Sequence, residues 1–194
     1  MSLYTIPCVV FAGGKSSRMG EDKSLLPFTH AHSLAQYQYK RLEDIFTDVY
    51  ISTKQTVKFD HINAKFIEDS IAPDIYAPTV AFVSIFNQLK TENAIFVLSV
   101  DTPFVTKEVI DTLLEANTSD FDAIIARTPS GIHPLCGIYT RALEGPMMEM
   151  IQNDNHKLMG LLKRSNVYYV DIEDEDLFMN INTQDEYKKA LDKL

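Results

Sequence analysis

Apolar runs and amphipathic segments alternate along almost the whole chain. The runs at 6–11 and 95–100 are continuous, which is typical of strands covered on both faces. Residues 33–46 instead place apolar side chains at helical spacing after Ser33, a predicted N-cap. The other predicted strands are 48–52, 65–68, 123–126, 135–139 and 167–170. The other predicted helices are 78–89, 106–116, 142–152, 158–163 and one that opens at a capping box of Thr183 and Glu186.

This alternation predicts the fold class. Strands that alternate with helices imply βαβ units and a mostly parallel sheet. We therefore expect an α/β fold of three layers, α/β/α, with ligands bound at the carboxyl ends of the strands. At ~150 residues per domain, the 194 residues predict a single domain, 1–194.

Composition narrows the class of protein. The chain is 45% hydrophobic and carries a net charge of −9, which disfavours nonspecific binding to nucleic acid or to anionic membranes. No apolar run approaches the ~18 residues of a membrane span, and residues 1–10 lack the basic segment and cleavage site of a secretory signal. Cys8 and Cys136 lie in apolar runs, as reduced core thiols do. We expect a cytoplasmic protein without nucleic-acid or membrane partners.

A glycine-rich loop follows the first predicted strand. Residues 13–23 contain three of the seven glycines and three of the 18 basic residues. Consecutive backbone amides in such a turn form an anion-binding concavity, and nearby cations suit a triphosphate. The segment is not a Walker A loop, because Val9 stands where that motif needs its first glycine, and G-x-G-x-x-G is also absent. An ordinary strand-to-loop connection is the alternative.

An aspartate ends the predicted central strand. Asp101 follows the run 95–100 and precedes Pro103. Magnesium prefers one or two carboxylates together with phosphate oxygens, so Asp101 is a candidate Mg²⁺ ligand if the glycine loop holds phosphates. The alternative role is to organise the turn before the next helix.

The loop also carries a family resemblance. Residues 12–23, AGGKSSRMGEDK, resemble the signature A-G-G-x-S-x-R-M-G-x-D-K of the nucleotidyltransferase superfamily, and within it the molybdenum cofactor guanylyltransferase family. The resemblance extends from residue 6 to the last helix and implies a Rossmann-like nucleotidyltransferase fold. It implies Mg²⁺-dependent transfer of guanylyl from GTP to molybdopterin cofactor, which yields molybdopterin guanine dinucleotide and pyrophosphate. Cytidylyltransferase relatives more often carry Ala-Ala-Gly, so the Gly pair favours guanine.

The resemblance assigns roles to individual residues. It implies catalytic roles for Lys23, Arg18 and Asp101, with Asp101 as the metal ligand. It implies nucleotide binding by Ala12, Gly13, Gly14, Lys15, Ser16, Lys23, Asp69 and Asp101. It implies acceptor binding by Asn180, Asn182 and Lys157, with His156 beside Lys157 and residues 133–139 along the acceptor side. From the residues alone, Asp69 fits a strand-ending turn equally well, and Lys157 fits a solvent-facing helix end. For Asn182 the alternative is a local turn ahead of the Thr183 cap.

Three positions depart from the family pattern. Ala77 and Phe82 replace the two glycines of a G-P-L-A-G segment, and Ser52 or Thr53 stands where the family has asparagine. These positions are expected to shape the base and ribose pocket, so they bear on the choice of base more than on the phosphate chemistry.

Alternatives to guanylyl transfer therefore stay open. One is a cytidylyltransferase or another small-acceptor nucleotidyltransferase. Others are a non-catalytic nucleotide-binding carrier or regulatory subunit, and a plain structural flavodoxin-like domain. The expected partners are GTP, molybdopterin cofactor, and proteins that deliver the cofactor or mature molybdoenzymes.

Overall fold

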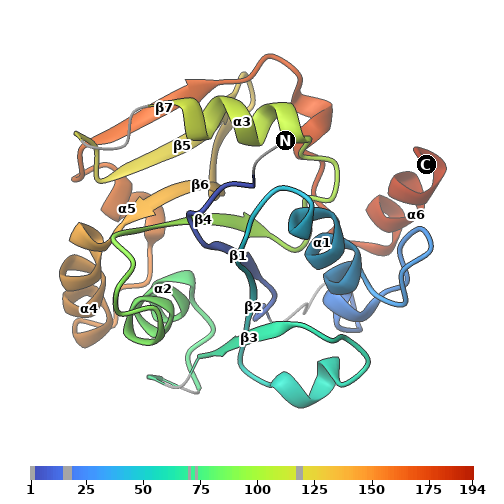
Figure 1. Cartoon of the computed structure of the whole chain (residues 1–194), viewed down its shortest axis with the longest axis horizontal. Helices are drawn as coiled ribbons and strands as arrows, with labels where there is room; N and C mark the ends of the chain where they lie inside the picture. Colours follow the sequence, from blue (N-terminus) through green and yellow to red (C-terminus); the bar gives the residue numbers. More distant parts are fainter. Residues whose placement is uncertain (1–2, 15–18, 70, 73, 117–119) are drawn as a thin grey trace.

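The computed structural model describes residues 3–14, 19–69, 71–72, 74–116 and 120–194. Within them, seven strands form one sheet in the order β3-β2-β1-β4-β6-β5-β7 (Figure 1). The strands are β1 (Cys8–Phe11), β2 (Val49–Thr53), β3 (Lys65–Glu68), β4 (Ala94–Ser99), β5 (Ala123–Thr128), β6 (Gly131–Thr140) and β7 (Val167–Asp171). All neighbours pair in parallel except β6, which is antiparallel to both β4 and β5. The expected mostly parallel sheet is confirmed.

Helices cover both faces of this sheet. Helices α1 (Leu34–Glu43), α3 (Lys107–Glu115) and α6 (Gln184–Asp192) lie on one side, and α2 (Pro78–Gln88), α4 (Glu144–Gln152) and α5 (Leu158–Leu162) lie on the other (Figure 1). The sheet is therefore the middle layer of an α/β/α arrangement, as predicted.

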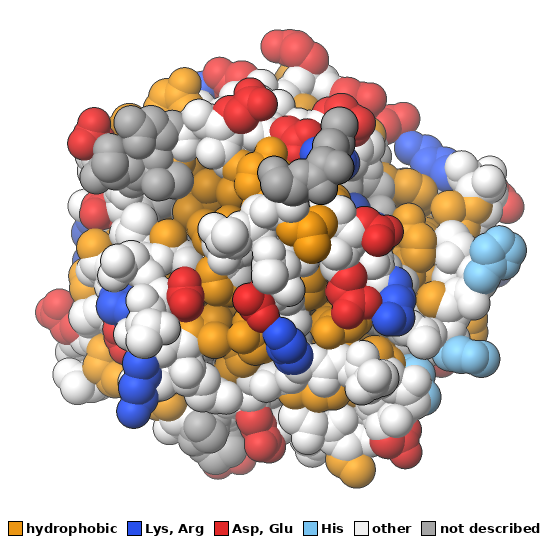
Figure 2. Space-filling view, in the orientation of Figure 1, with side chains coloured by type: hydrophobic (Ala, Val, Ile, Leu, Met, Phe, Trp, Pro, Cys, Tyr) orange, Lys and Arg blue, Asp and Glu red, His pale blue; other side chains and the backbone are white. Residues whose placement is uncertain are grey.

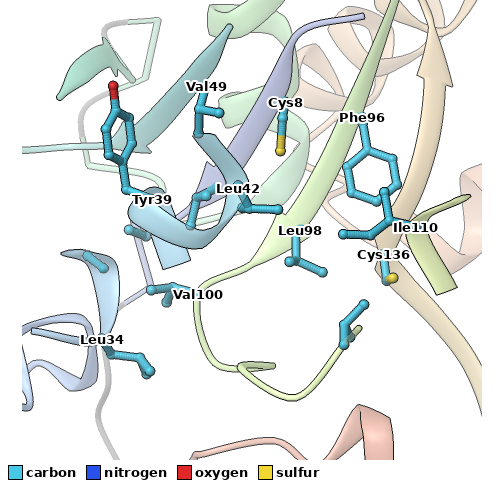
Figure 3. Close-up of a cluster of buried hydrophobic side chains, with 14 of the residues drawn as sticks. Cys8, Leu34, Tyr39, Leu42, Val49, Phe96, Leu98, Val100, Ile110 and Cys136 are labelled. Carbon is cyan, nitrogen blue, oxygen red and sulfur yellow. The ribbon is translucent and has the colours of Figure 1, made fainter. Parts of the chain in front are cut away.

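Alternate side chains of the central strands feed two hydrophobic cores. In β1, Cys8 and Val10 join the core beneath α1 and α3, while Val9 and Phe11 join the core beneath α2, α4 and α5. Figure 3 shows the first of these cores, where Leu42 of α1 lies over the strands that carry Cys8 and Leu98. Both faces of the central strands are covered, which explains why their sequences read as continuous apolar runs.

Most predicted elements appear within two residues of their expected ends, and the caps agree with the sequence signals. Ser33 Oγ accepts from the Gln36 amide at 3.2 Å, and Thr183 Oγ1 accepts from the Glu186 amide at 3.2 Å. The capping box at Thr183 differs in one respect, because the Glu186 carboxylate accepts from the amide of Asn182, one residue before the cap, at 2.8 Å.

The strand predicted at 135–139 is wrong in extent, because β6 begins at Gly131. Two steps along β5, from Ile125 to Arg127, correspond to five along β6, from Gly137 to Ile132. A bulge in β6 accommodates the surplus residues. Pro134 lies in this bulge, where a residue without an amide hydrogen costs no ladder bond.

The distribution of surface charge and the burial of the two cysteines agree with the expectations from composition. Lys and Arg side chains are scattered singly over the face shown in Figure 2, among many carboxylates. Cys8 and Cys136 are free and buried. No helix in the described part of the chain combines the length and hydropathy that crossing a bilayer requires.

Candidate active site

The glycine loop leaves the sheet at the carboxyl end of β1. The Ala12 amide donates to the Ser52 carbonyl of β2 at 2.9 Å, which fixes the start of the loop against the neighbouring strand. A Cβ on Gly13 would lie 3.3 Å from Asp69 Oδ2, so a side chain there would crowd that carboxylate. Gly20 has a φ of +79°, a backbone conformation that favours glycine. The predicted Lys15, Ser16 and Arg18 lie outside the described residues.

Three predicted site residues from distant parts of the chain meet beside this loop. Lys23 opens a short 3₁₀ helix, η1 (Lys23–Leu25), and its Nζ contacts the carboxylate Oδ2 of Asp101. The same Nζ donates to Asn182 Oδ1 at 2.7 Å. The Lys23 and Asp101 side chains are only 15% and 12% exposed, so their charges interact with little water between them. The structure thus joins a predicted catalytic cation, a predicted metal ligand and a predicted acceptor-binding amide in one cluster.

A second ion pair braces the loop from outside. Lys58 lies in the 3₁₀ helix η2 (Thr56–Phe59), and its Nζ donates to Asp22 Oδ2 at 2.6 Å and to the Ala12 carbonyl at 3.2 Å. The other oxygen of Asp22 caps η1 by accepting from the Ser24 amide at 3.0 Å. Lys58 therefore ties both ends of the glycine loop together. Nothing in the sequence around Lys58 indicates this role, since it depends on a contact 36 residues away along the chain.

Asp69 follows β3 and is 5% exposed. Its Oδ1 accepts from Ser52 Oγ at 3.0 Å, and its Oδ2 faces the loop at Gly13. Burial raises the pKa of the Asp69 carboxyl, and the Ser52 hydroxyl opposes this shift. Ser52, one of the two residues expected to replace the family's asparagine, thus places a hydrogen-bonding group beside the carboxylate.

These elements enclose a cleft at the carboxyl ends of the parallel strands. Its walls come from the glycine loop, the ends of β2 and β4, and the start of α2. Its lining residues are Phe11, Ala12, Gly13, Gly14, Asp22, Lys23, Ser24, Ser52, Asp69, Tyr76, Ala77, Pro78, Ala81, Ser99, Val100, Asp101 and Leu135. The position agrees with the rule that open α/β sheets bind ligands beyond the carboxyl ends of their strands.

A second cavity adjoins the cleft at Asp101. Both cavities are lined by Ser99, Asp101 and Leu135, so the Asp101 carboxylate stands where they meet. The remaining residues of the second cavity are Thr102, Ile132, His133, Pro134, Cys136 and Asn180. Two ligands could therefore approach one carboxylate from two sides.

The β6 bulge forms the wall between the two cavities. Tyr139 is fully buried, and its Oη donates to the Pro134 carbonyl at 2.6 Å, which holds the bulge in shape. A Cβ on Gly137 would lie 2.2 Å from the Ile124 carbonyl oxygen, so only glycine lets β6 resume close pairing there. Leu135, at the middle of the bulge, faces both cavities. Bulges of this kind often re-aim side chains beside active sites. Pro134, directly before the predicted strand 135–139, was the available sequence signal.

The second cavity also contains a histidine and a thiol. The His133 ring stacks on Phe178 with centroids 4.1 Å apart, and its Nε2 lies 2.9 Å from Thr128 Oγ1. Burial lowers the pKa of His133, so its ring is mainly neutral at neutral pH. Burial also raises the pKa of Cys136 to about 12. That thiol stays protonated, which favours a core role over a nucleophilic one.

The two residues of α2 and its N-cap that depart from the family pattern lie in different surroundings. Ala77 lines the cleft beside Pro78. Phe82 is fully buried and absent from the cleft lining, and its ring packs against Phe11 and Tyr139 with centroids 4.9 and 4.3 Å away. The large side chain at position 82 therefore extends the core beneath α2 and leaves the cleft open.

The remaining acceptor candidates lie apart from one another. Asn180 lines the second cavity, and its Nδ2 donates to the Phe178 carbonyl at 3.3 Å. Lys157 is exposed at the start of α5 and lines neither cavity. Its neighbour His156 reaches α2, with Nδ1 3.2 Å from Thr79 Oγ1. The structure thus brings Asn180 and Asn182 to the Asp101 region and leaves Lys157 outside it.

Comparisons with known proteins agree with this geometry. The model of the family described as MobA-like NTP transferase domain matches residues 8–167. The chain is 37% identical over 194 residues to the molybdenum cofactor guanylyltransferase of Campylobacter jejuni strain RM1221, covering 100% of both chains. It is 31% identical over 191 residues to the protein of that name from Helicobacter pylori strain G27, covering 96% of this chain and 92% of the relative.

A solved structure shows the same fold. The molybdopterin-guanine dinucleotide biosynthesis protein A from Archaeoglobus fulgidus superposes with a TM-score of 0.81 at 22% identity. The match covers 97% of this chain and 98% of that one. The expected nucleotidyltransferase fold is confirmed. The family model and the two relatives together show that the chain belongs to the MobA-like NTP transferase family, among the molybdenum cofactor guanylyltransferases, and is a nucleotidyltransferase.

Proposed function

We propose that this enzyme transfers the guanylyl group of GTP to the terminal phosphate of molybdopterin cofactor, with Mg²⁺ bound. An oxygen of the acceptor phosphate attacks the α-phosphorus, the bond from that phosphorus to the α–β bridging oxygen breaks, and pyrophosphate leaves. The product is molybdopterin guanine dinucleotide. The observation that carries the proposal is the position of Asp101, with Lys23 attached, between two cavities. The names of the relatives support the choice of base and acceptor.

The nucleotide occupies the cleft beside the glycine loop. Backbone amides at Gly13 and Gly14 face its phosphates, and the oxygens of Asp69 accept from sugar or base hydrogens. Among the described residues, no heavy atom lies within 4 Å of a Cβ built on Gly14, which leaves room for a ligand on that side. Tyr76, 45% exposed at the cleft, offers a ring on which the base stacks, and Lys54 Nζ lies 5.5 Å from the centre of that ring.

The acceptor occupies the second cavity. Its phosphate approaches Asp101 past the β6 bulge, and Asn180 and Thr102 supply polar contacts there. An ionised phosphate is already a nucleophile, so the step needs no general base, which agrees with a neutral His133. Holding both reactants on one line contributes on the order of 7–11 kcal/mol to catalysis.

The residues present fit a magnesium ion that binds together with the substrate phosphates. Asp101 offers a carboxylate where the two cavities meet, and the described residues contain no group of three His, Cys, Asp or Glu that could hold a metal by themselves. Mg²⁺ is commonly bound by one or two carboxylates, substrate phosphates and water. When bound, the ion neutralises phosphate charge. Lys23 adds a positive charge at the α-phosphate, where negative charge develops.

The alternative functions, a cytidylyltransferase and a non-catalytic carrier, are not supported equally. A cytidylyltransferase would use the same phosphate machinery, so the base decides between the two. A non-catalytic carrier does not explain why Lys23, Asp101 and Asn182 converge, and the matching family model is described as an NTP transferase domain. Proteins that deliver the cofactor stay predicted partners.

The test is calorimetry of GTP, CTP and ATP binding, with and without Mg²⁺. We expect GTP to bind most tightly and Mg²⁺ to strengthen its binding, followed by turnover with molybdopterin cofactor and pyrophosphate release. A preference for CTP would move the enzyme to the cytidylyl branch. Absence of binding for all three nucleotides would overturn the proposal.

A further inference from the structure

Two polar side chains of α1 hold the segment that carries Asp101. Gln38 is fully buried, and its Nε2 donates to the carbonyls of Ser99 at 3.1 Å and Val100 at 3.3 Å. Arg41 lies one turn further along α1. Its Nε donates to Gln38 Oε1 at 2.6 Å, and one terminal nitrogen donates to the Val105 carbonyl at 2.7 Å. The loop from 99 to 105 is therefore held near both of its ends.

Burying Gln38 and Arg41 between α1 and the 99–105 loop carries a desolvation cost. The surrounding face of α1 is apolar, with Leu34 and Leu42 packed into the same core (Figure 3). No carboxylate forms an ion pair with Arg41 in the described residues, and its Nη2 is buried there without a hydrogen-bond partner. Burial accordingly lowers the pKa of Arg41. Aliphatic side chains would fill the volume without this desolvation cost, so what the pair adds is donors for three backbone carbonyls.

Those carbonyls belong to the loop that sets the site. Asp101 follows Val100 directly, and its own carbonyl accepts from the Ile181 amide at 2.9 Å. The next residue, Asn182, contacts Lys23, which pairs with Asp101. A shift of the 99–105 loop would therefore move the carboxylate, the amide and the cation together.

We propose that Gln38, oriented by Arg41, is a positioning residue for Asp101 and thereby sets the geometry of metal-assisted transfer. The inference rests on the proposed function. It concerns the carboxylate and leaves the glycine loop unaffected, because neither Gln38 nor Arg41 lines the cleft. A misplacement of about 1 Å can cost about 10²-fold in rate, so the loss of donors to Ser99 and Val100 is expected to slow turnover while nucleotide binding persists.

The experiment compares two variants at Gln38 with a control on the same helix. Gln38→Met removes the donor and keeps the volume. Gln38→Glu keeps an acceptor for Arg41 and loses the amide donor, so it retains the link to Arg41 if the methionine variant fails to fold. Gln36→Met is the control, because the Gln36 side chain accepts from the His32 amide at 2.8 Å, whereas the described side-chain hydrogen bonds from α1 to the loop come from Gln38 and Arg41.

The readouts separate positioning from folding. Mn²⁺ binding in the presence of a non-hydrolysable GTP analogue is measured by electron paramagnetic resonance, analogue binding in EDTA by calorimetry, and folding by thermal unfolding. We expect the Mn²⁺ dissociation constant to rise about tenfold and kcat to fall about tenfold or more in both Gln38 variants. Analogue affinity in EDTA stays at the wild-type value, and Gln36→Met matches wild type in Mn²⁺ affinity, analogue affinity and kcat.

Three results would overturn the inference. Folded Gln38 variants with wild-type Mn²⁺ affinity and kcat would show that the contacts do not position Asp101. Loss of the fold in both Gln38 variants would make the role structural. Wild-type protein that binds Mn²⁺ with no analogue dependence would defeat the proposed function itself, and with it this inference.

Discussion

Replacing Lys23 with methionine removes the cation that contacts both Asp101 and Asn182 and keeps most of the side-chain volume. In the proposed reaction Lys23 acts where charge develops at the α-phosphate, so its removal should affect the transition state more than the ground state. Removal of one such stabilising donor typically lowers kcat by about 10²–10³, or about 2.7–4 kcal/mol. We expect a kcat loss of that size for Lys23→Met, with a much smaller change in the dissociation constant of GTP.

The same substitution leaves the Asp101 carboxylate, 12% exposed, without its cation. Loss of one partner from a buried ion pair commonly costs about 3–5 kcal/mol, and the partial exposure of this pair places the expected loss of stability at or below the low end of that range. Because Lys23 and a bound metal compete for one carboxylate, the variant should also bind Mg²⁺ more tightly than wild type in the absence of nucleotide.

The assay combines steady-state kinetics with GTP and molybdopterin cofactor, calorimetry with GTP, and urea unfolding with and without Mg²⁺. The matched control is Lys40→Met, since Lys40 forms an exposed pair with Glu43 on α1. Equal losses in kcat and in GTP affinity would refute the reasoning and assign Lys23 to binding alone. Unchanged kcat would remove Lys23 from the chemistry.

Three further predictions concern the walls of the two cavities. Tyr139→Phe leaves the carbonyl at the β6 bulge without its donor, so urea unfolding should show a loss of about 1–3 kcal/mol. Its KM for the acceptor should rise more than its KM for GTP, and the opposite order would detach the bulge from the acceptor side. Burial raises the pKa of Asp69 above its unfolded value, so this group lowers stability as pH rises through that interval. Asp69→Asn should therefore unfold at a higher temperature than wild type at pH 7, with the gap narrowing toward pH 4, while GTP binding weakens; a gap independent of pH would contradict the assignment. Tyr76→Ala should weaken GTP binding in calorimetry by about 1–3 kcal/mol if the base stacks there. Tyr168→Ala, at a tyrosine that is also 45% exposed but lines neither cavity, should leave it unchanged, and equal effects would refute the stacking role.

The sequence by itself determined the helices and strands and predicted the chemistry of the glycine loop. Hydrophobic periodicity predicts the strands and helices because burial on one or both faces imposes spacing on neighbouring residues. Glycine and lysine in residues 12–23, and an aspartate after a buried strand, indicate phosphate chemistry because both features lie within short stretches of chain. Lys23 and Asp101 were therefore identifiable from their own stretches and Asn182 through the family resemblance, although the contacts among the three were not.

Only the tertiary structure decided which polar groups meet. Gln38 and Arg41 occupy a helix whose sequence alone does not identify the loop carbonyls that they satisfy 61 and 64 residues away. Lys58 stands in a connection without any motif, and its partner Asp22 lies 36 residues away along the chain. Phe82 is a large residue near the start of α2, and whether it fills the cleft or the core depends on the packing of that helix.

The position of β6 between β4 and β5 was likewise decided by the tertiary structure. An antiparallel strand in a mostly parallel sheet is set by the order of pairing, which is a long-range property. Its bulge depends on Gly137 approaching the β5 backbone and on a hydroxyl reaching Pro134. Local periodicity fixes which side chains face a core, whereas the partners of buried polar groups depend on three-dimensional proximity, and these partners are what shape the two cavities around Asp101.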